Sequence, residues 1–561
     1  MISRHFATIP AGRFGARQVH YRRMGHGPLV LMLHQSPLSS RDLEPVMQRW
    51  ADRFTMIAPD TPGYGLSDPF GVEVVEMDDV AQGVVEFLDA IGVQRCAVYG
   101  FHTGAMIAAA LAAGFPERVS AAVANGYVVL SPEERADIVA NYLPRFEPQW
   151  DGSHLTWLWA RLREQTIFFP WYARRLENRM DFDVPSTGQL QAGLVEFLRS
   201  GDHYRIGYRA AFTFRSQEAL ARVRGPMLVT AASFDPLHSH LERITRKSPS
   251  VEVVPGGSLD ATLAMAADFL AQHAYDAAPA VVRTQPLRGR MWSDMLDVPG
   301  GQLRVRRNTD VDGTTVLVQH DAASASDTVE PVSQSLVGQR PVLAIDLPGH
   351  GESDNTIGED DVTVAKYAGV VWQVLDALGL DRVDFYGMWG GGLVGLEMAS
   401  QRPDRIGHLV MSDVLWFDDA LIRRLQADYT PPIEVNWYGG HLLMCWHLMR
   451  DQGLFWPWFD RTRAGILWRE PYLDPQMIQL RVTNMLKAPT MWRRAYQAHF
   501  AYPIRARLPA VRVPVLLCAP QWDPNFTHTE AAAQANPQCE WRVLPDRMSE
   551  WGSAFLEFLE H

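Results

Sequence analysis

Cysteine is scarce in this sequence and forms no recognisable pattern. Only four cysteines occur among 561 residues, none in C-x-x-C spacing: Cys96, Cys445, Cys518 and Cys539. This distribution excludes a disulfide framework and a cysteine-based zinc site. We therefore expect a reducing compartment, no metal site and no cofactor.

Long apolar runs and clusters of positive charge are also missing. No stretch approaches the roughly 18 apolar residues of a membrane span. Residues 1–6 include a charged residue, so they do not begin the apolar region of a signal peptide. Asp and Glu (64) outnumber Lys and Arg (52), which gives a net charge of -12. Nucleic acid and anionic membranes are thus poor candidate partners. With 47% apolar and 21% charged residues, we expect a globular, cytoplasmic protein.

An internal repeat organises the chain. The tetrapeptide Gly-Ser-His-Leu at 152–155, followed by Trp159, returns 287 residues later as Gly-Gly-His-Leu at 439–442, followed by Trp446. Nearly the same separation relates His34 to His320, Gly63 to Gly349, Gly100 to Gly387, and Asp235 to Asp523. The chain thus contains two copies of a unit of about 280 residues.

The junction between the two copies falls at 276–296. Small residues and prolines at 276–280 and 286–289 are typical of a linker. We predict domain 1 over 1–275, with a helical cap at about 128–218, and domain 2 over 297–561, with a cap at about 415–506.

Short apolar segments alternate with helical segments in each copy. In the first copy we predict buried strands at 29–33, 54–58, 96–99, 227–230 and 251–254, and helices at 80–91, 105–114 and 261–272. All-apolar strands between helices indicate an α/β fold with a mostly parallel, doubly wound sheet that is buried on both faces.

Four motifs recur in the same order in both copies. The first copy has His-Gln-Ser-Pro at 34–37, Asp-Thr-Pro-Gly-Tyr-Gly at 60–65, Gly-Phe-His-Thr-Gly at 100–104 and Asp-Pro at 235–236; the second has matching segments at 320–321, 346–354, 387–391 and 523–524. Each half therefore resembles an α/β-hydrolase with a helical cap between its sixth and seventh strands. The resemblance implies two tandem α/β-hydrolase domains.

Both copies depart from the catalytic triad of that superfamily. The centre of the G-x-S-x-G elbow is His102 in the first copy and Trp389 in the second, where the family has a nucleophile. No histidine follows the last strand, at 255–259 or at 544–549. Only the acid is retained, as Asp235 or Asp523. These degenerate triads exclude ordinary serine-esterase chemistry.

A polar set nevertheless remains in the first copy. His102 and Asp235 are the candidate acid–base pair, with Ser36 as a further catalytic candidate. Gln35 and Thr103 are the candidate oxyanion donors. The helix N-terminus favours a neutral His102 and Asp235 favours the imidazolium, so the sequence leaves its protonation state open.

Three residues are candidates for substrate binding: His34, His154 and Trp159. Each also has a structural interpretation, because His34 begins the oxyanion loop, His154 is a cap histidine and most cap tryptophans serve packing. The many aromatic residues of the caps favour a small hydrophobic or aromatic substrate.

The second copy is predicted to be non-catalytic. An indole offers no useful acid or base, so Trp389 is expected to be largely buried in the nucleophile's place, with Asp523 beside it.

Two classes of function follow. The first is a cofactor-independent enzyme that uses His102 and Asp235 on a hydrophobic carbonyl compound, by hydrolysis or by C–C or C–X bond cleavage (lyase chemistry). The second is a pseudoenzyme that binds a hydrophobic ligand or a protein partner. We also expect the halves to form an intramolecular pseudo-dimer. Further homo-oligomerisation stays open.

Overall fold

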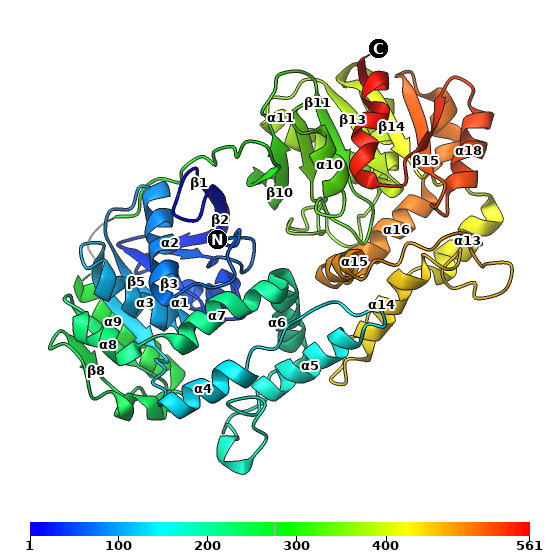
Figure 1. Cartoon of the computed structure of the whole chain (residues 1–561). Coiled ribbons are helices and arrows are strands. Elements are labelled where there is room, and N and C mark those ends of the chain that lie inside the picture. Colours follow the sequence, from blue (N-terminus) through cyan, green and yellow to red (C-terminus); the bar gives the residue numbers. More distant parts are fainter. Residues whose placement is uncertain (274–276, 561) are drawn as a thin grey trace. The chain divides into compact units, whose positions relative to one another are not determined.

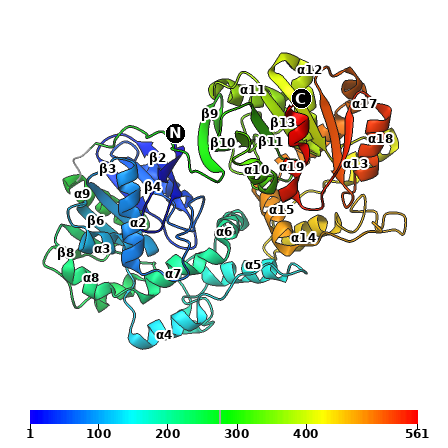
Figure 2. The same ribbon diagram turned by 45° about the horizontal axis from the view of Figure 1, so that its top comes forward.

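A computed structural model describes residues 1–273 and 277–560 of the chain. The described residues form two compact units, and the ribbon views show an α/β architecture in each (Figures 1 and 2). The first unit contains Met1–Glu147 and Trp157–Gln285, and the second contains Pro148–Thr156 and the chain from Pro286 onward.

The first unit is built on an eight-stranded sheet of order β1-β2-β4-β3-β5-β6-β7-β8. Its strands are β1 (Ser3–Ile9), β2 (Arg17–Gly25), β3 (Leu29–Leu33), β4 (Thr55–Pro59), β5 (Cys96–Phe101), β6 (Val119–Asn125), β7 (Met227–Thr230) and β8 (Val251–Val253). The β1–β2 and β2–β4 pairs are antiparallel and the others are parallel. This confirms the predicted mostly parallel sheet.

Helices cover both faces of this sheet. They are α1 (Glu44–Trp50), α2 (Met77–Ala90), α3 (Thr103–Gly114) and α9 (Leu259–His273). The side chains of β3 alternate between two cores: Val30 and Met32 pack with α1 and α9, whereas Leu31 and Leu33 pack with α2 and α3. Because successive residues of a strand point to opposite faces, a strand covered on both sides must be apolar throughout, as β3 is.

A helical insertion separates β6 from β7. It contains α4 (Pro132–Asn141), α5 (Ser153–Gln165), α6 (Thr187–Ser200), α7 (Tyr204–Thr213) and α8 (Ser216–Arg222). Figure 1 shows these helices, in cyan and green, beyond one edge of the strands of the first sheet. The first four helices lie within the range expected for the cap.

The second unit repeats the topology, with the order β16-β15-β14-β13-β11-β12-β10-β9. Its strands are β9 (Trp292–Val298), β10 (Gly301–Asn308), β11 (Thr315–Gln319), β12 (Val342–Ile345), β13 (Val383–Met388), β14 (Ile406–Ser412), β15 (Val515–Pro520) and β16 (Glu540–Leu544). Its helices are α10 (Glu330–Leu336), α11 (Val364–Ala377), α12 (Gly390–Gln401), α18 (Phe526–Ala535) and α19 (Trp551–Leu556), with the cap helices α13 (Asp419–Asp428), α14 (Gly440–Asp451), α15 (Pro475–Lys487), α16 (Met491–Ala501) and α17 (Ile504–Arg507).

The division between the units falls after Gln285, inside the expected linker 276–296. Strand β9 begins at Trp292, so the last residues of that range belong to the second sheet. Residues 274–276, at the start of the expected linker, lie outside the described residues. Among the described residues, no helix combines the length and apolar character needed to span a membrane.

Candidate active site

The turn between β5 and α3 holds its central residue in a left-handed conformation. His102 has φ 48° and ψ -109°, a backbone conformation that residues other than glycine rarely adopt. The flanking glycines make this turn possible: a Cβ on Gly100 would lie 2.0 Å from the Gly104 carbonyl oxygen, and one on Gly104 would lie 2.0 Å from the Leu33 carbonyl oxygen. The elbow geometry is therefore retained although its central residue is a histidine.

His102 and Asp235 form a direct pair. The Nε2 atom of His102 lies 2.8 Å from Oδ2 of Asp235, and Oδ1 of Asp235 accepts a hydrogen bond from the Leu237 amide at 2.8 Å. An ionised carboxylate can only accept hydrogen bonds, so Nε2 carries the proton. Among the described residues, the other ring nitrogen, Nδ1, has no hydrogen-bond partner. It is the nitrogen left for water or substrate.

The pair resolves the protonation question that the sequence left open. Burial disfavours the charged imidazole, but the charge and hydrogen bond of Asp235, together with the charge of Asp42, outweigh burial and raise the pKa of His102 above its usual 6.5. Burial also opposes the Asp235 carboxylate, but the charge and hydrogen bond of His102 lower the pKa of Asp235 below its usual 3.8. The combined effect of Asp235 and Asp42 on the pKa of His102 therefore exceeds that of burial.

The expected oxyanion residues lie next to the elbow. The Ser36 amide donates to Oγ1 of Thr103 at 3.3 Å, and the side-chain amide of Gln35 donates to Oδ2 of Asp42 at 3.0 Å. The Thr103 amide, at the first position of α3, has no acceptor among the described residues and remains available to an anion. The Ser36 hydroxyl is covered by protein, so it is not open to a substrate.

Asp42 is a site residue that sequence reasoning missed. Burial raises its pKa to about 6, although the Gln35 hydrogen bond and the charge of His102 act in the other direction. It lies in η1 (Ser40–Leu43), eight residues after His34 and outside the four repeated motifs. Its position in the first helical turn after the oxyanion loop was the only available signal.

A cleft of about 370 Å³ opens beside the elbow. Its lining is mostly apolar and aromatic, with Phe101, Phe169, Phe182, Leu190 and Phe234 among its side chains. Apart from two tyrosines, the ionisable side chains among the lining residues are His102 and Asp235, and no lysine or arginine is among them. The cleft therefore suits an uncharged, largely apolar molecule.

The three candidate substrate-binding residues do not line this cleft. His34 is buried, with Nδ1 2.8 Å from the Gln35 carbonyl oxygen and Nε2 accepting from the Thr61 amide at 2.9 Å, so it holds the loop. The ring of His154 bonds to the Gln149 amide and to Gln479, and Trp159 is buried in the cap. Their hydrogen-bonding and packing needs are met within the protein, which corrects the expectation that they face a substrate.

The second elbow carries an indole in the same backbone conformation. Trp389 has φ 50°, and its Nε1 donates to Oδ2 of Asp523 at 3.1 Å. The ring is partly buried and lines a cavity of about 100 Å³. Burial raises the pKa of Asp523 to about 6.

A carboxylate occupies the oxyanion position of the second domain. Asp321 corresponds to Gln35, and its Oδ1 accepts a hydrogen bond at 3.0 Å from the amide of Gly390, the counterpart of Thr103. Its Oδ2 accepts from the Tyr496 hydroxyl at 2.8 Å. The amide that would stabilise a substrate oxyanion is therefore already bonded to the protein's own anion.

The described residues include no group of three or more His, Cys, Asp or Glu side chains placed to hold a metal ion.

Comparison with known families agrees with this architecture. The sequence profile of the alpha/beta hydrolase fold matches residues 28–258 and 315–432, which together are more than half of the chain. The chain belongs to the α/β-hydrolase fold family. The two matched ranges lie in the two units, so the family fold is present twice.

Curated relatives resemble only part of the chain. The 2-(acetamidomethylene)succinate hydrolase of Mesorhizobium japonicum is 32% identical over 138 residues, which cover 23% of this chain and 49% of that protein. Haloalkane dehalogenase 2 of Mycobacterium tuberculosis is 32% identical over 106 residues, 19% of this chain and 37% of that protein. The chain thus spans less than half the length of these relatives.

Solved structures with the same fold are more distant in sequence. A hydrolase from Pseudomonas aeruginosa PA01 is 20% identical, with a TM-score of 0.37 over 47% of this chain and 98% of that one. The enol-lactonase from Burkholderia xenovorans LB400 is 18% identical, with a TM-score of 0.35 over 47% of this chain and 96% of that one.

Proposed function

We propose that the first domain is a cofactor-independent enzyme that acts on a small hydrophobic carbonyl compound by acid–base catalysis, with His102 as the catalytic base and Asp235 as its orienting partner. The observation that carries the proposal is the 2.8 Å contact between Nε2 of His102 and Oδ2 of Asp235 on an intact elbow. The second domain is non-catalytic in this proposal.

The proposed reaction starts from neutral His102. Nδ1 takes a proton from a water molecule as the water oxygen attacks the substrate carbonyl carbon, and Asp235 stabilises the imidazolium that forms. The Thr103 amide donates to the developing oxyanion. When the tetrahedral intermediate collapses, the imidazolium returns the proton to the leaving group. For C–C or C–X cleavage, the same nitrogen would remove a substrate proton instead.

The cleft supports the substrate class. A lining without lysine or arginine offers no partner for a charged metabolite, while its aromatic residues suit an apolar body. In the second domain, Trp389 in the nucleophile's place and Asp321 at the oxyanion amide support the absence of catalysis.

The test uses hydrolysis of the aryl lactone 3,4-dihydrocoumarin and of 4-nitrophenyl butyrate, followed by absorbance. General acid–base catalysis is typically worth about 10²–10⁴-fold, so His102→Ala is expected to lower kcat/KM by that order. Asp235→Asn is expected to cost a comparable factor by misorienting the imidazole. His26→Ala, at an exposed histidine of the same domain, is the matched control and should leave the rate unchanged.

Two results would overturn the proposal. One is full activity of His102→Ala in a folded protein. The other is a wild-type protein that binds these probes but turns none of them over, which would favour a pseudoenzyme with a hydrophobic ligand.

A further inference from the structure

The cavity of the second domain contains a charged residue that the first cleft lacks. Arg481 lies on α15 at the position that corresponds to Gly193 on α6, as the equivalent N-caps Asp474 and Ser186 show. The first cleft is lined by Gly193 and the second cavity by Arg481. The two pockets are therefore equivalent in the fold but differ in charge.

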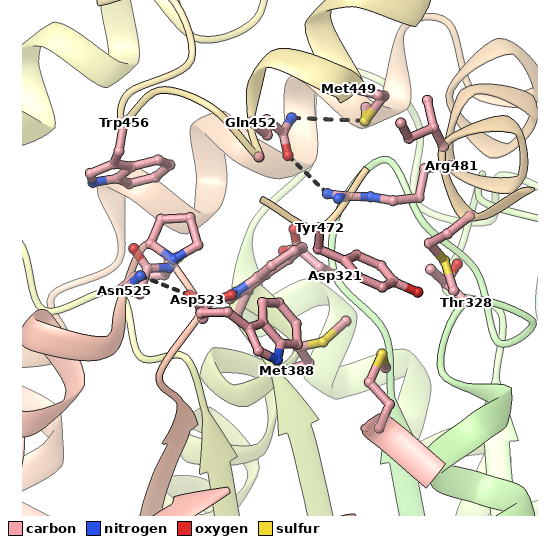
Figure 3. Close-up of a pocket in the computed structure, with 18 of the residues that line it drawn as sticks. Asp321, Thr328, Met388, Met449, Gln452, Trp456, Tyr472, Arg481, Asp523 and Asn525 are labelled. Atoms are coloured by element: carbon pink, nitrogen blue, oxygen red, sulfur yellow. Dashed lines mark hydrogen bonds between the residues drawn. The ribbon is translucent and has the colours of Figure 1, made fainter. Parts of the chain in front are cut away.

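The guanidinium of Arg481 is held in place without being neutralised. Its Nη2 donates to Oε1 of Gln452 at 2.8 Å, and Figure 3 shows the two side chains pointing toward one another. Its Cζ lies 5.0 Å from the centre of the Trp389 ring, a cation–π distance. Among the described residues, no carboxylate lies within 4 Å of the guanidinium. An arginine has five N–H donors, so donors remain for a ligand.

The acidic residues that line the same cavity have other partners or lie in solvent. Asp523 accepts hydrogen bonds from Trp389 Nε1 and from the Asn525 amide at 2.7 Å. Both oxygens of Asp321 are bonded, to the Gly390 amide and the Tyr496 hydroxyl. Glu470 is exposed. Arg481 is therefore a charged side chain of the lining that has no carboxylate paired with it among the described residues.

The other residues of the lining determine what kind of molecule could bring a negative charge to Arg481. Four methionines and seven aromatic residues line the cavity, among them Met388, Met449, Met548, Trp456, Tyr472 and Trp522. Methionine side chains adapt to irregular apolar shapes and make favourable contacts with aromatic rings. A single guanidinium in a cavity that is also lined by three acidic residues suits a monoanion better than a phosphate dianion.

We propose that the cavity of the second domain is a non-catalytic binding site for a small monocarboxylate with an apolar or aromatic body, and that the carboxylate pairs with Arg481. The site is separate from the proposed catalytic site and does not depend on its chemistry. Arginine and a carboxylate form a planar, charge-assisted pair, which is the strongest hydrogen-bonded contact that this lining offers.

The test measures binding of benzoate to the full chain by isothermal titration calorimetry, with benzamide as the uncharged analogue of the same shape. Benzoate is expected to bind at least about 10-fold more tightly than benzamide. Arg481→Met keeps the apolar stem and removes the charge, and it is expected to weaken benzoate binding by about 10-fold or more. Arg481→Lys should weaken it less, because it keeps a charge but loses the planar fork.

A second measurement locates the ligand in the protein with Arg481 intact. With ¹³C-methyl-labelled methionine, benzoate is expected to shift the NMR signals of Met388, Met449 and Met548, assigned by single Met→Leu variants, and to leave that of Met180 in the first cleft unchanged. The proposal is wrong if benzamide binds as tightly as benzoate, if folded Arg481→Met binds benzoate like the wild type, or if benzoate shifts Met180 and not the three methionines.

Discussion

At the scale of single residues, the two elbows have the same backbone conformation but carry side chains of different chemistry. Both central residues adopt φ near 50°, and both contact the acid that follows the seventh strand of their domain. The imidazole of His102 has a second nitrogen that can exchange a proton, whereas the only nitrogen of the Trp389 indole is used in its bond to Asp523. The capacity for acid–base chemistry is thus confined to the first elbow.

The sequence predicted the His102–Asp235 contact because both positions follow family motifs whose spacing is preserved. It did not predict Asp42 or Asp321 as site groups, because their roles depend on how a loop folds back toward a helix N-terminus. The pKa of His102 also required coordinates, since the opposing contributions of burial and Asp235 could be compared only with their geometry known.

Asp413 provides a residue-scale prediction about stability. It takes the place of Gly126, has φ 59°, and is fully buried without hydrogen-bond partners for either carboxylate oxygen among the described residues. Burial and the nearby Asp523 raise the pKa of Asp413 well above its usual value. We expect Asp413→Gly to stabilise the protein, by about 1–3 kcal/mol, because it removes an unsatisfied buried group and a strained conformation.

The pH dependence of that gain follows from the sign of the shift. An acid with a raised folded-state pKa gives stability that is fully present below its unfolded-state pKa, near 3.8, and is lost as the pH rises through the folded-state value. The gain from Asp413→Gly should therefore be larger at pH 8 than at pH 4 in thermal unfolding. Asp413→Asn removes the charge but keeps a side chain in the strained backbone conformation, so it separates the contribution of charge to stability from that of strain. A gain from Asp413→Gly that is the same at both pH values would contradict this account.

At the scale of elements, the strands and helices predicted for the first copy lie within a few residues of β3, β4, β5, β7 and β8 and of α2, α3 and α9, whereas the parallel strand β6 was not predicted. Continuous apolar runs such as β3 identify strands covered on both faces. The antiparallel strands β1, β2, β9 and β10 were not predicted. All four strands lack a continuous apolar run, β2 and β10 each contain three arginines, and the beginning of β9 lay within the expected linker.

The cap helix α6 gives the element-scale prediction. Gly193 lines the first cleft, and a Cβ there would meet no atom within 4 Å, so the space above it is open. Gly193→Arg places in this space the side chain that the second domain has at Arg481. We expect kcat/KM for 3,4-dihydrocoumarin to fall by about 10-fold or more through a narrowed, charged cleft.

The matched variant is Gly193→Ala, which adds one methyl group and favours the helix by about 0.5–1 kcal/mol. It should raise the thermal midpoint and change kcat/KM much less than Gly193→Arg. Equal turnover by the wild type and a folded Gly193→Arg would show that substrate does not occupy this part of the cleft.

At the scale of the whole molecule, the repeat in the sequence predicted two similar domains, and two sheets of the same strand order confirm it. The packing of the halves as an intramolecular pseudo-dimer stays a prediction. Three hydrophobic cores among the described residues each draw their residues from one half of the chain, two from the first and one from the second.

Separate cores predict separate unfolding. Val30 and Val316 are equivalent, fully buried residues of β3 and β11. We expect calorimetry to show two transitions, with Val30→Ala lowering only one midpoint and Val316→Ala lowering only the other, each through a loss of about 1–3 kcal/mol. A single transition that both variants shift equally would mean that the domains unfold as one cooperative unit.

The central claim is that His102, with its pKa raised by Asp235, is the base of the first domain. The most direct measurement is the pH dependence of kcat/KM for 3,4-dihydrocoumarin in the wild type and in Asp235→Asn. Because the neutral imidazole is the reactive form, the wild-type rate should rise with pH through a midpoint above 6.5. In Asp235→Asn the midpoint should move to lower pH, with a lower plateau, because the carboxylate that favours the imidazolium is gone. A wild-type profile without such a midpoint, or one whose midpoint is unchanged in Asp235→Asn, would contradict the account.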